Sequence, residues 1–288
     1  MTHMHVAALQ QSFSDAIDTN IDRVEALVRE AAGRGAKVIL PSELFEGHYF
    51  CKVQNEGFFS RAAPVGSHKA VRAMQKLAKD LGVYIPTSFF ERDGQHYYNS
   101  LAMIDDQGDV MGVYRKSHIP DGPGYNEKFY FRPGNTGFRV WPTRYGTVGI
   151  GICWDQWYPE AARLTALKGA EVLIYPTAIG WDNQEPSSEI NREQYQAWQT
   201  VQRGHAVANE VPVIAVNRVG EENGQTFWGG SFVSNAFGRV IYQAPHNTEE
   251  VAVVEIDLDA QEQYRRIWPF MRDRRIDSFG DITKRVID

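Results

Sequence analysis

The second half of the sequence repeats the order of segments in the first half, and this repeat limits the possible folds more than any other feature. The segment GAKVILPS at residues 35–42 matches GAEVLIYPT at residues 169–177. Each copy enters an apolar run through Gly-Ala and leaves it at a proline followed by a hydroxyl residue. Other matched segments lie at similar offsets of about 130 residues, and similarity at one offset indicates a duplicated unit.

Apolar spacing predicts the elements of the repeated unit. In the first half we expect helices at residues 21–32 and 68–81, because their apolar residues recur at helical intervals. Short apolar runs predict strands, and a turn through residues 105–108 predicts a hairpin. The expected strands of the first half are residues 5–10, 38–40, 83–90, 97–104 and 110–114. The repeated unit that we expect is βαβαββ, with one more strand in the closing hairpin of the first half.

Two such units bury most of their apolar surface if the sheets pack face to face and the helices lie outside. We therefore expect an α/β fold, a duplicated αββα four-layer sandwich. No linker-like composition separates the halves, so residues 1–275 are expected to form a single domain built from two similar halves. Residues 276–288 are expected to be a C-terminal tail.

Composition and charge exclude several classes of function. The formal net charge of −6 argues against a nucleic-acid partner, because neutralising phosphates needs a basic face. No apolar stretch approaches the ~20 residues of a membrane span, and the N-terminus lacks a signal-peptide pattern, so we expect no membrane partner. Two widely separated cysteines, Cys51 and Cys153, favour a reducing, cytoplasmic location.

Cys153 stands where an apolar strand, residues 148–153, is expected to turn into a helix at residues 161–168. Pro159 and Glu160 suit the first turn of that helix. Backbone N–H groups at such a turn are expected to lower the pKa of the thiol and to hold a developing oxyanion. An isolated cysteine after a strand also fits a small buried apolar residue, so this interpretation depends on partners elsewhere.

Two further polar residues lie just beyond predicted strands. Glu43 follows the strand at residues 38–40, and Lys116 follows the strand at residues 110–114. Ligands bind at the carboxyl ends of strands in parallel-type sheets, so Glu43, Lys116 and Cys153 are expected to converge there. A carboxylate, a cation and a thiol are groups that thiol-dependent acyl transfer requires.

The sequence around these residues resembles the Glu, Lys and Cys motifs of the nitrilase, or carbon-nitrogen hydrolase, superfamily. The motifs are ILPSELFEGHYF around Glu43, YRKSHIPDGPGYNEKFYFRPGNTGF around Lys116 and GICWDQWYPEAARL around Cys153. The resemblance extends to about Asp273, and within the superfamily it is most similar to the N-carbamoylputrescine amidohydrolase branch. It implies the duplicated sandwich and a reaction without a metal or an organic cofactor.

The resemblance also implies a role for each residue. Cys153 is the nucleophile, and Glu43 takes its proton and later protonates the leaving nitrogen. Lys116 and the backbone N–H of Trp154 stabilise the tetrahedral oxygen. Glu127 resembles a second glutamate of the family that positions the lysine and the substrate. A histidine base is therefore unnecessary.

Aromatic and acidic residues near the motifs favour a small ureido or amide substrate with a cationic tail. The positions directly after Cys153 offer no arginine to pair with a substrate carboxylate. The candidates for substrate binding are Tyr49, Trp154, Asp155, Trp181 and Glu185, with Asp182 in the same loop.

We expect an enzyme that cleaves N-carbamoylputrescine to putrescine, carbon dioxide and ammonia through a Cys-bound thioester. The alternatives are a β-ureidopropionase-like hydrolase or an ω-amidase and, from another class, a catalytically silent metabolite-binding protein. Residues 262–280 combine aromatic residues with several arginines, and a solvated tail rarely carries so much apolar surface. Because the family docks this segment across a subunit interface, we expect a homo-oligomer.

Overall fold

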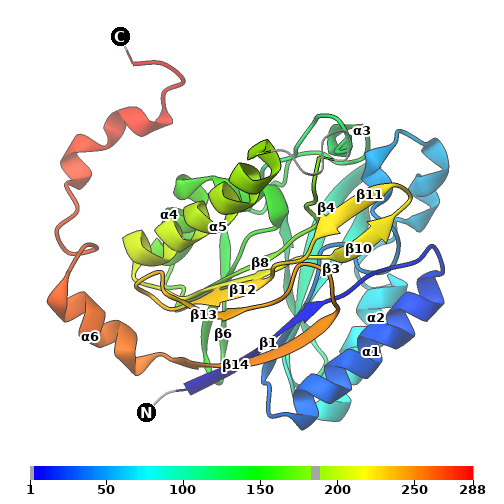
Figure 1. Ribbon diagram of the computed structural model, residues 1–288, viewed down its shortest axis with the longest axis horizontal. Helices are drawn as coiled ribbons and strands as arrows, with labels where there is room; N and C mark the ends of the chain where they lie inside the picture. Colours follow the sequence, from blue (N-terminus) through cyan, green and yellow to red (C-terminus); the bar gives the residue numbers. More distant parts are fainter. Residues whose placement is uncertain (1–2, 183–188, 288) are drawn as a thin grey trace.

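The computed structural model describes residues 3–182 and 189–287. Two layers of strands lie between helices on both outer sides (Figure 1). The first layer has the order β14-β1-β2, and a parallel bridge between Val38 and Tyr84 continues it into β3-β4-β5. Its strands are β14 (Glu250–Asp257), β1 (His3–Gln10), β2 (Val38–Pro41), β3 (Ile85–Asp93), β4 (His96–Ile104) and β5 (Val110–Arg115).

The second layer is a six-stranded sheet with the order β13-β12-β9-β8-β7-β6. Its strands are β13 (Val240–Gln243), β12 (Phe232–Ser234), β9 (Val213–Val216), β8 (Val172–Pro176), β7 (Gly146–Ile150) and β6 (Arg139–Thr143). A separate hairpin, β10 (Val219–Glu222) with β11 (Gln225–Trp228), stands beside this sheet.

The two layers have the same topology. From β14 to β5, neighbouring strands pair antiparallel, parallel, parallel, antiparallel and antiparallel. From β6 to β13 the sequence of pairings is identical. The predicted duplicated αββα sandwich is therefore confirmed.

The main differences from the expected unit are the outer strands β14 and β6. β14 comes from the end of the second half and pairs with β1, so it links the two halves of the chain. β7 also ends at Ile150, three residues earlier than expected, and a short 3-10 helix, η3 (Cys153–Trp157), begins at Cys153.

Apolar residues of both sheets form the central core, which includes Val6, Leu101, Ile150 and Ile214. The helices α1 (Ile17–Gly33) and α2 (Lys69–Leu81) pack on the first sheet. The helices α4 (Pro159–Leu167) and α5 (Glu189–Asn209) cover the second sheet. In Figure 1 the two helix pairs lie on opposite sides of the strands. None of the helices within the described residues is long and apolar enough to cross a membrane.

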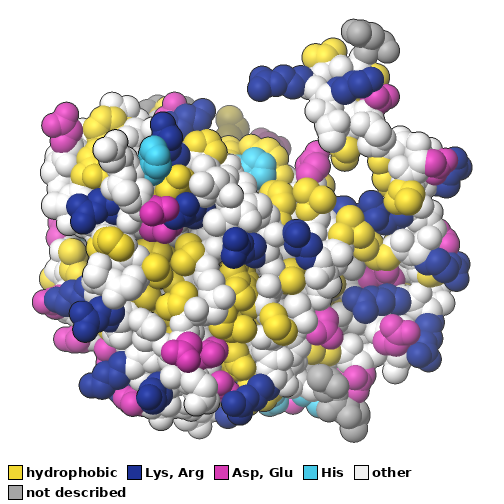
Figure 2. All heavy atoms as spheres, turned by 180° about the vertical axis from the view of Figure 1, so that it is seen from behind, with side chains coloured by type: hydrophobic (Ala, Val, Ile, Leu, Met, Phe, Trp, Pro, Cys, Tyr) yellow, Lys and Arg dark blue, Asp and Glu magenta, His cyan; other side chains and the backbone are white. Residues whose placement is uncertain are grey.

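The C-terminal segment leaves the body of the molecule after β14. It forms α6 (Asp259–Ile267) and the short 3-10 helices η4 (Ile276–Ser278) and η5 (Gly280–Thr283). Figures 1 and 2 show its last part projecting from the sandwich. Several apolar side chains on it are exposed, including Trp268 (58%) and Ile276 (71%).

Candidate active site

Glu43, Lys116, Glu127 and Cys153 meet at the ends of strands, although they come from distant parts of the chain. Glu43 lies two residues beyond β2, Lys116 directly follows β5, and Cys153 lies three residues beyond β7. Glu127 is the first residue of the short helix α3 (Glu127–Tyr130). All four side chains are buried.

Lys116 connects the two glutamates. Its Nζ donates to Glu43 Oε1 at 2.9 Å, and to Glu127 Oε1 at 2.9 Å and Oε2 at 2.7 Å. Burial alone would lower the pKa of the Lys116 ammonium, but the adjacent carboxylates outweigh burial and hold the pKa well above its usual range. The site therefore contains a permanent positive charge beside two carboxylates.

The two oxygens of Glu43 have different surroundings. Oε1 accepts from Lys116 Nζ and also from Asn99 Nδ2, at 2.7 Å. Oε2 is buried and has no hydrogen-bond partner among the described residues. A buried carboxylate oxygen without a donor is costly, and it is also ready to accept a proton.

Cys153 occupies a strained turn in a buried environment. Its φ of 43° lies in the left-handed region, which costs a non-glycine residue about 1–2 kcal/mol. Burial raises the pKa of the thiol, and the negative charge of Glu43 raises it further. The prediction that this turn lowers the thiol pKa is therefore wrong, because desolvation is the largest effect. A thiol that is protonated in the resting protein needs a base beside it.

Asp155 fixes the turn that carries Cys153. Its Oδ2 accepts from Ile152 N at 3.0 Å and from the Tyr114 hydroxyl at 2.7 Å. Its Oδ1 accepts from the backbone N–H of His118 at 3.0 Å and from His118 Nδ1 at 2.7 Å. Asp155 was expected to contact substrate, but it is fully buried and is not among the described residues that line the pocket beside Cys153. The 3-10 turn directs this carboxylate into the protein instead.

Tyr49 is also placed differently from the expectation. Its hydroxyl donates to Glu127 Oε1 at 2.6 Å, and its side chain is buried outside the pocket lining. Tyr49 therefore contacts a proposed catalytic residue rather than the space available to substrate.

Arg218, which sequence reasoning did not identify, holds the loop that carries Glu43. Its buried guanidinium donates to the carbonyl oxygens of Glu43 and Leu44 at 2.8 and 2.6 Å, and to Gly47 O at 2.9 Å. It also forms a buried ion pair with Glu222 at 2.8 Å. Leu44 has a φ of 48°, so this loop, like the Cys153 turn, is strained and held from outside.

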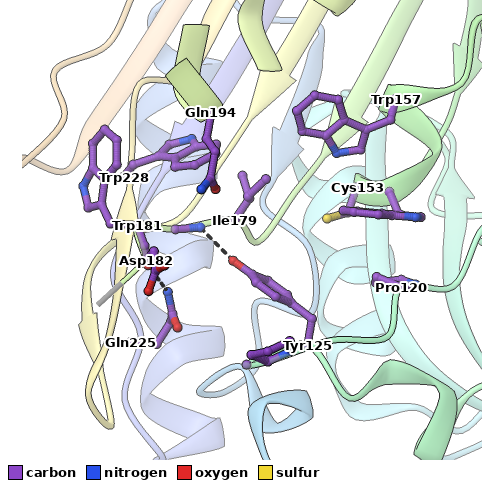
Figure 3. A pocket seen from close by; sticks show the side chains of 14 residues that line it. Pro120, Tyr125, Cys153, Trp157, Ile179, Trp181, Asp182, Gln194, Gln225 and Trp228 are labelled. Atoms are coloured by element: carbon purple, nitrogen blue, oxygen red, sulfur yellow. Dashed lines mark hydrogen bonds between the residues drawn. The ribbon is translucent and has the colours of Figure 1, made fainter. Parts of the chain in front are cut away.

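A pocket of about 520 Å³ opens beside Cys153. In Figure 3, Cys153 lies on one side, Trp181, Asp182 and Gln225 lie on the other, and Tyr125 stands between them. The N–H of Gly180 donates to the Tyr125 hydroxyl at 3.0 Å, which joins two walls of the pocket. The other lining residues are Pro120, Pro123, Gly124, Trp154, Trp157, Ile179, Gln194 and Trp228.

Trp154 and Trp181 line this pocket as expected for residues near the substrate, and so does Asp182. Glu185 lies outside the described residues. Four tryptophans contribute to the walls, and none of the described lining residues is a lysine or arginine. Asp182 is the acidic member of that lining. The described walls of the pocket are therefore largely aromatic, with one carboxylate among them.

The histidines lie in structural roles. His118 contacts Asp155, and its ring stacks on Tyr158 with centroids 3.7 Å apart. His205 is buried in α5 and hydrogen bonds to Gln156 O at 2.8 Å, as expected of a packed residue. Within residues 3–182 and 189–287, there is no group of three or more His, Cys, Asp or Glu side chains suited to a metal ion.

Known proteins resemble this chain over nearly its whole length. The family model described as carbon-nitrogen hydrolase matches residues 5–266. The chain is 50% identical to N-carbamoylputrescine amidase from Arabidopsis thaliana, over 95% of this chain and 93% of that protein. It is 44% identical to citrullinase from Francisella tularensis, over 99% of this chain and 100% of that protein.

One solved structure also matches the chain over nearly its whole length. The crystal structure of a carbon-nitrogen hydrolase from Helicobacter pylori G27 superposes with a TM-score of 0.94 at 42% sequence identity. The match covers 99% of this chain and 100% of that chain.

Proposed function

The chain belongs to the carbon-nitrogen hydrolase family and is a hydrolase of amides or ureides, and from this premise we propose that it cleaves N-carbamoylputrescine to putrescine, carbon dioxide and ammonia. The observation that carries the proposed chemistry is the buried Cys153 thiol beside Glu43, whose Oε2 has no described donor. The observation that supports the substrate is the aromatic pocket with Asp182 in its wall.

We propose the following order of bond changes. Glu43 Oε2 takes the proton of the Cys153 thiol while the sulfur adds to the ureido carbonyl carbon. The positive charge of Lys116 and the backbone N–H of Trp154 stabilise the oxyanion, and one such donor is typically worth ~3 kcal/mol. Glu43 then returns the proton to the leaving nitrogen, the carbon–nitrogen bond breaks, and a thioester on Cys153 remains.

Water completes the reaction. Glu43 is again unprotonated, and it takes a proton from a water molecule that attacks the thioester carbon. The thiol of Cys153 leaves with that proton, and the carbamate product decomposes to carbon dioxide and an amine or ammonia. In the resting site Lys116 carries its proton, because the charges of Glu127 and Glu43 hold the pKa of its ammonium high.

Recognition of the substrate tail is proposed to depend on the far end of the pocket. Trp154 and Trp181 offer ring surface to the alkyl chain, and the carboxylate of Asp182 attracts the ammonium group. Changing Asp182 to Asn should raise KM for N-carbamoylputrescine about 5-fold and leave kcat nearly constant, which corresponds to ~1 kcal/mol for an accessible ion pair. An unchanged KM would remove Asp182 from this role.

Citrulline is the second candidate, because a citrullinase is similar to this chain over its full length. It has the same ureido group and amine as N-carbamoylputrescine, with an added carboxylate. The described pocket lining offers no lysine or arginine to pair with that carboxylate, which favours the substrate that lacks it.

The deciding experiment measures ammonia release from N-carbamoylputrescine, citrulline, N-carbamoyl-β-alanine and a simple ω-amide. We expect kcat/KM to be highest for N-carbamoylputrescine, and no turnover in a Cys153→Ala variant. A preference for citrulline or N-carbamoyl-β-alanine would overturn the proposed substrate. A preference for the ω-amide would assign the ω-amidase alternative.

We also propose that residues 1–275 act as one domain in the cytoplasm, and that the C-terminal segment contacts a second copy of the chain. Leu164 and Leu167 of α4 are exposed, and Phe279 and Ile282 face this helix across a cavity of about 580 Å³. Light scattering should give the mass of a dimer or a larger homo-oligomer. A monomer at micromolar concentration would contradict this.

A further inference from the structure

Asn99 connects two of the proposed catalytic residues from one position in β4. Its side-chain Nδ2 donates to Glu43 Oε1 at 2.7 Å. Its backbone oxygen accepts from Lys116 N at 2.9 Å. Asn99 is 1% exposed, and water therefore does not compete for these contacts.

The side-chain amide of Asn99 makes fewer hydrogen bonds than we expect of a buried residue that only supports the fold. Its Oδ1 is buried and has no hydrogen-bond partner among the described residues. Leaving a buried acceptor unpaired is unfavourable, and a leucine of similar size would avoid that cost. The function of the amide must therefore lie at Nδ2, which points at Glu43.

The donor also distinguishes the two oxygens of Glu43. Asn99 and Lys116 both donate to Oε1, and Oε2 is left without a described partner. Two donors on one oxygen fix the rotation of the carboxylate group. Oε2 is then the oxygen available for the proton of a nucleophile.

We propose that Asn99 is a positioning residue that holds the Glu43 carboxylate in one orientation, with Oε2 directed to the proton of Cys153. This inference rests on the proposed role of Glu43 as the base. To that role it adds Asn99 as the residue that orients the base, and Oε2 as the oxygen of Glu43 that accepts the proton.

The test uses alkylation of Cys153 by iodoacetamide, which needs no knowledge of the substrate. The rate is measured between pH 5 and pH 9 by mass spectrometry of the Cys153 peptide, and Cys153→Ala gives the background from Cys51. The variants are Asn99→Leu, which removes the donor, and Asn99→Asp, which places a second carboxylate beside Glu43.

We expect Asn99→Leu to slow alkylation about 10- to 100-fold at pH 7, because Glu43 Oε2 is then no longer held toward the thiol, and a displacement of about 1 Å costs roughly 100-fold. The acid limb of the pH–rate profile, where the alkylation rate falls as the pH is lowered, should lie about one pH unit higher in Asn99→Leu than in the wild type. Asn99→Asp should move the acid limb further, because two like charges would share one site.

Asn209→Leu is the matched control. Asn209 is also buried and donates one hydrogen bond to His205 O at 2.9 Å, and its Oδ1 has no partner among the described residues, but this hydrogen bond stays within α5 and does not reach Glu43. This variant should lose stability similarly and alkylate at the wild-type rate with an unmoved acid limb.

Glu43→Gln separates the inference from the function on which it rests. If Glu43→Gln is alkylated slowly but Asn99→Leu keeps the wild-type rate and the wild-type acid limb, the role of Asn99 alone is overturned. Wild-type alkylation in Glu43→Gln would overturn the base itself. Variants of Asn99 that do not fold, as judged by circular dichroism and thermal denaturation, would make it a residue of the core and also overturn the inference.

Discussion

Arg218→Met tests how the strained loop that carries Glu43 is held in place. Arg218 is fully buried and makes hydrogen bonds to three carbonyl oxygens of this loop in addition to its ion pair with Glu222. The substitution keeps much of the side-chain volume and removes every donor. Glu222, which is 1% exposed, would retain the hydrogen bond from Tyr49 N but lose its cation.

The expected cost follows from these contacts. Removing one partner of a buried ion pair destabilises a protein by about 3–5 kcal/mol, which is a large part of the 5–15 kcal/mol that stabilises a typical domain. The carbonyl oxygens of Glu43 and Leu44 would also lose donors, so the base would shift. A displacement of about 1 Å lowers kcat roughly 100-fold.

Urea denaturation followed by tryptophan fluorescence gives the free energy of unfolding, and steady-state ammonia release gives kcat. The double variant Arg218→Met/Glu222→Gln removes the unpaired charge and should regain about 2 kcal/mol of stability, but it should not regain kcat. Destabilisation below about 1 kcal/mol in the single variant, or wild-type kcat in the double variant, would refute this reasoning.

Four other substitutions test separate contacts. Glu127→Gln should lower kcat about 100-fold with little change in KM, because the two charge-assisted hydrogen bonds to Lys116 weaken. A kcat equal to that of the wild type would contradict this prediction. Asp155→Asn should lower kcat about 10-fold or more, because an amide cannot accept hydrogen bonds from all the donors at that carboxylate. His118→Gln should lower kcat less than Asp155→Asn does, and a larger loss in His118→Gln would count against this account. Burial lowers the pKa of His205 from 6.5, so the unfolded state binds this proton more readily, and unfolding free energy should fall below pH 6.5 by at most ~1.4 kcal/mol per pH unit. Urea titrations at pH 7 and 5.5 should show a smaller loss in His205→Gln, and an equal loss would exclude His205 as the source.

The interior strands could be predicted from the sequence because each is an apolar run buried on both faces. β2 and β8 are buried along their whole lengths, and both lie where the GA-led segments place them. β6 and β14 could not be found in this way, because each mixes buried, partly buried and exposed residues without a regular alternation. The pairing of β14 with β1 also joins residues at opposite ends of the chain, which local spacing does not encode.

Glu43, Lys116 and Cys153 could be placed together because each follows a strand end, and the motif resemblance adds Glu127. Asn99 and Arg218 act through hydrogen bonds to residues distant in sequence. The available signal for Asn99 was an amide side chain in the middle of a largely apolar strand. The sequence does not separate Asp155 from its neighbour Trp154, which lines the pocket, whereas the 3-10 turn directs Asp155 into the protein.

The same turn explains why the predicted direction of the thiol pKa shift was wrong. The sequence predicts backbone donors at a helix start, which lower the pKa of a thiol. It does not predict how deeply the sulfur is buried, and burial raises the pKa of Cys153 more than nearby positive charge lowers it. Activation of the thiol by a paired carboxylate therefore replaces activation by the turn in this account.

The central claim is that Cys153 forms a covalent thioester with the substrate carbonyl. Rapid quenching in acid during turnover of N-carbamoylputrescine, followed by mass spectrometry of the intact protein and its peptides, tests it directly. The account predicts an added acyl mass on the Cys153 peptide in the wild type, and neither adduct nor turnover in Cys153→Ala. Turnover that continues in Cys153→Ala would contradict the claim.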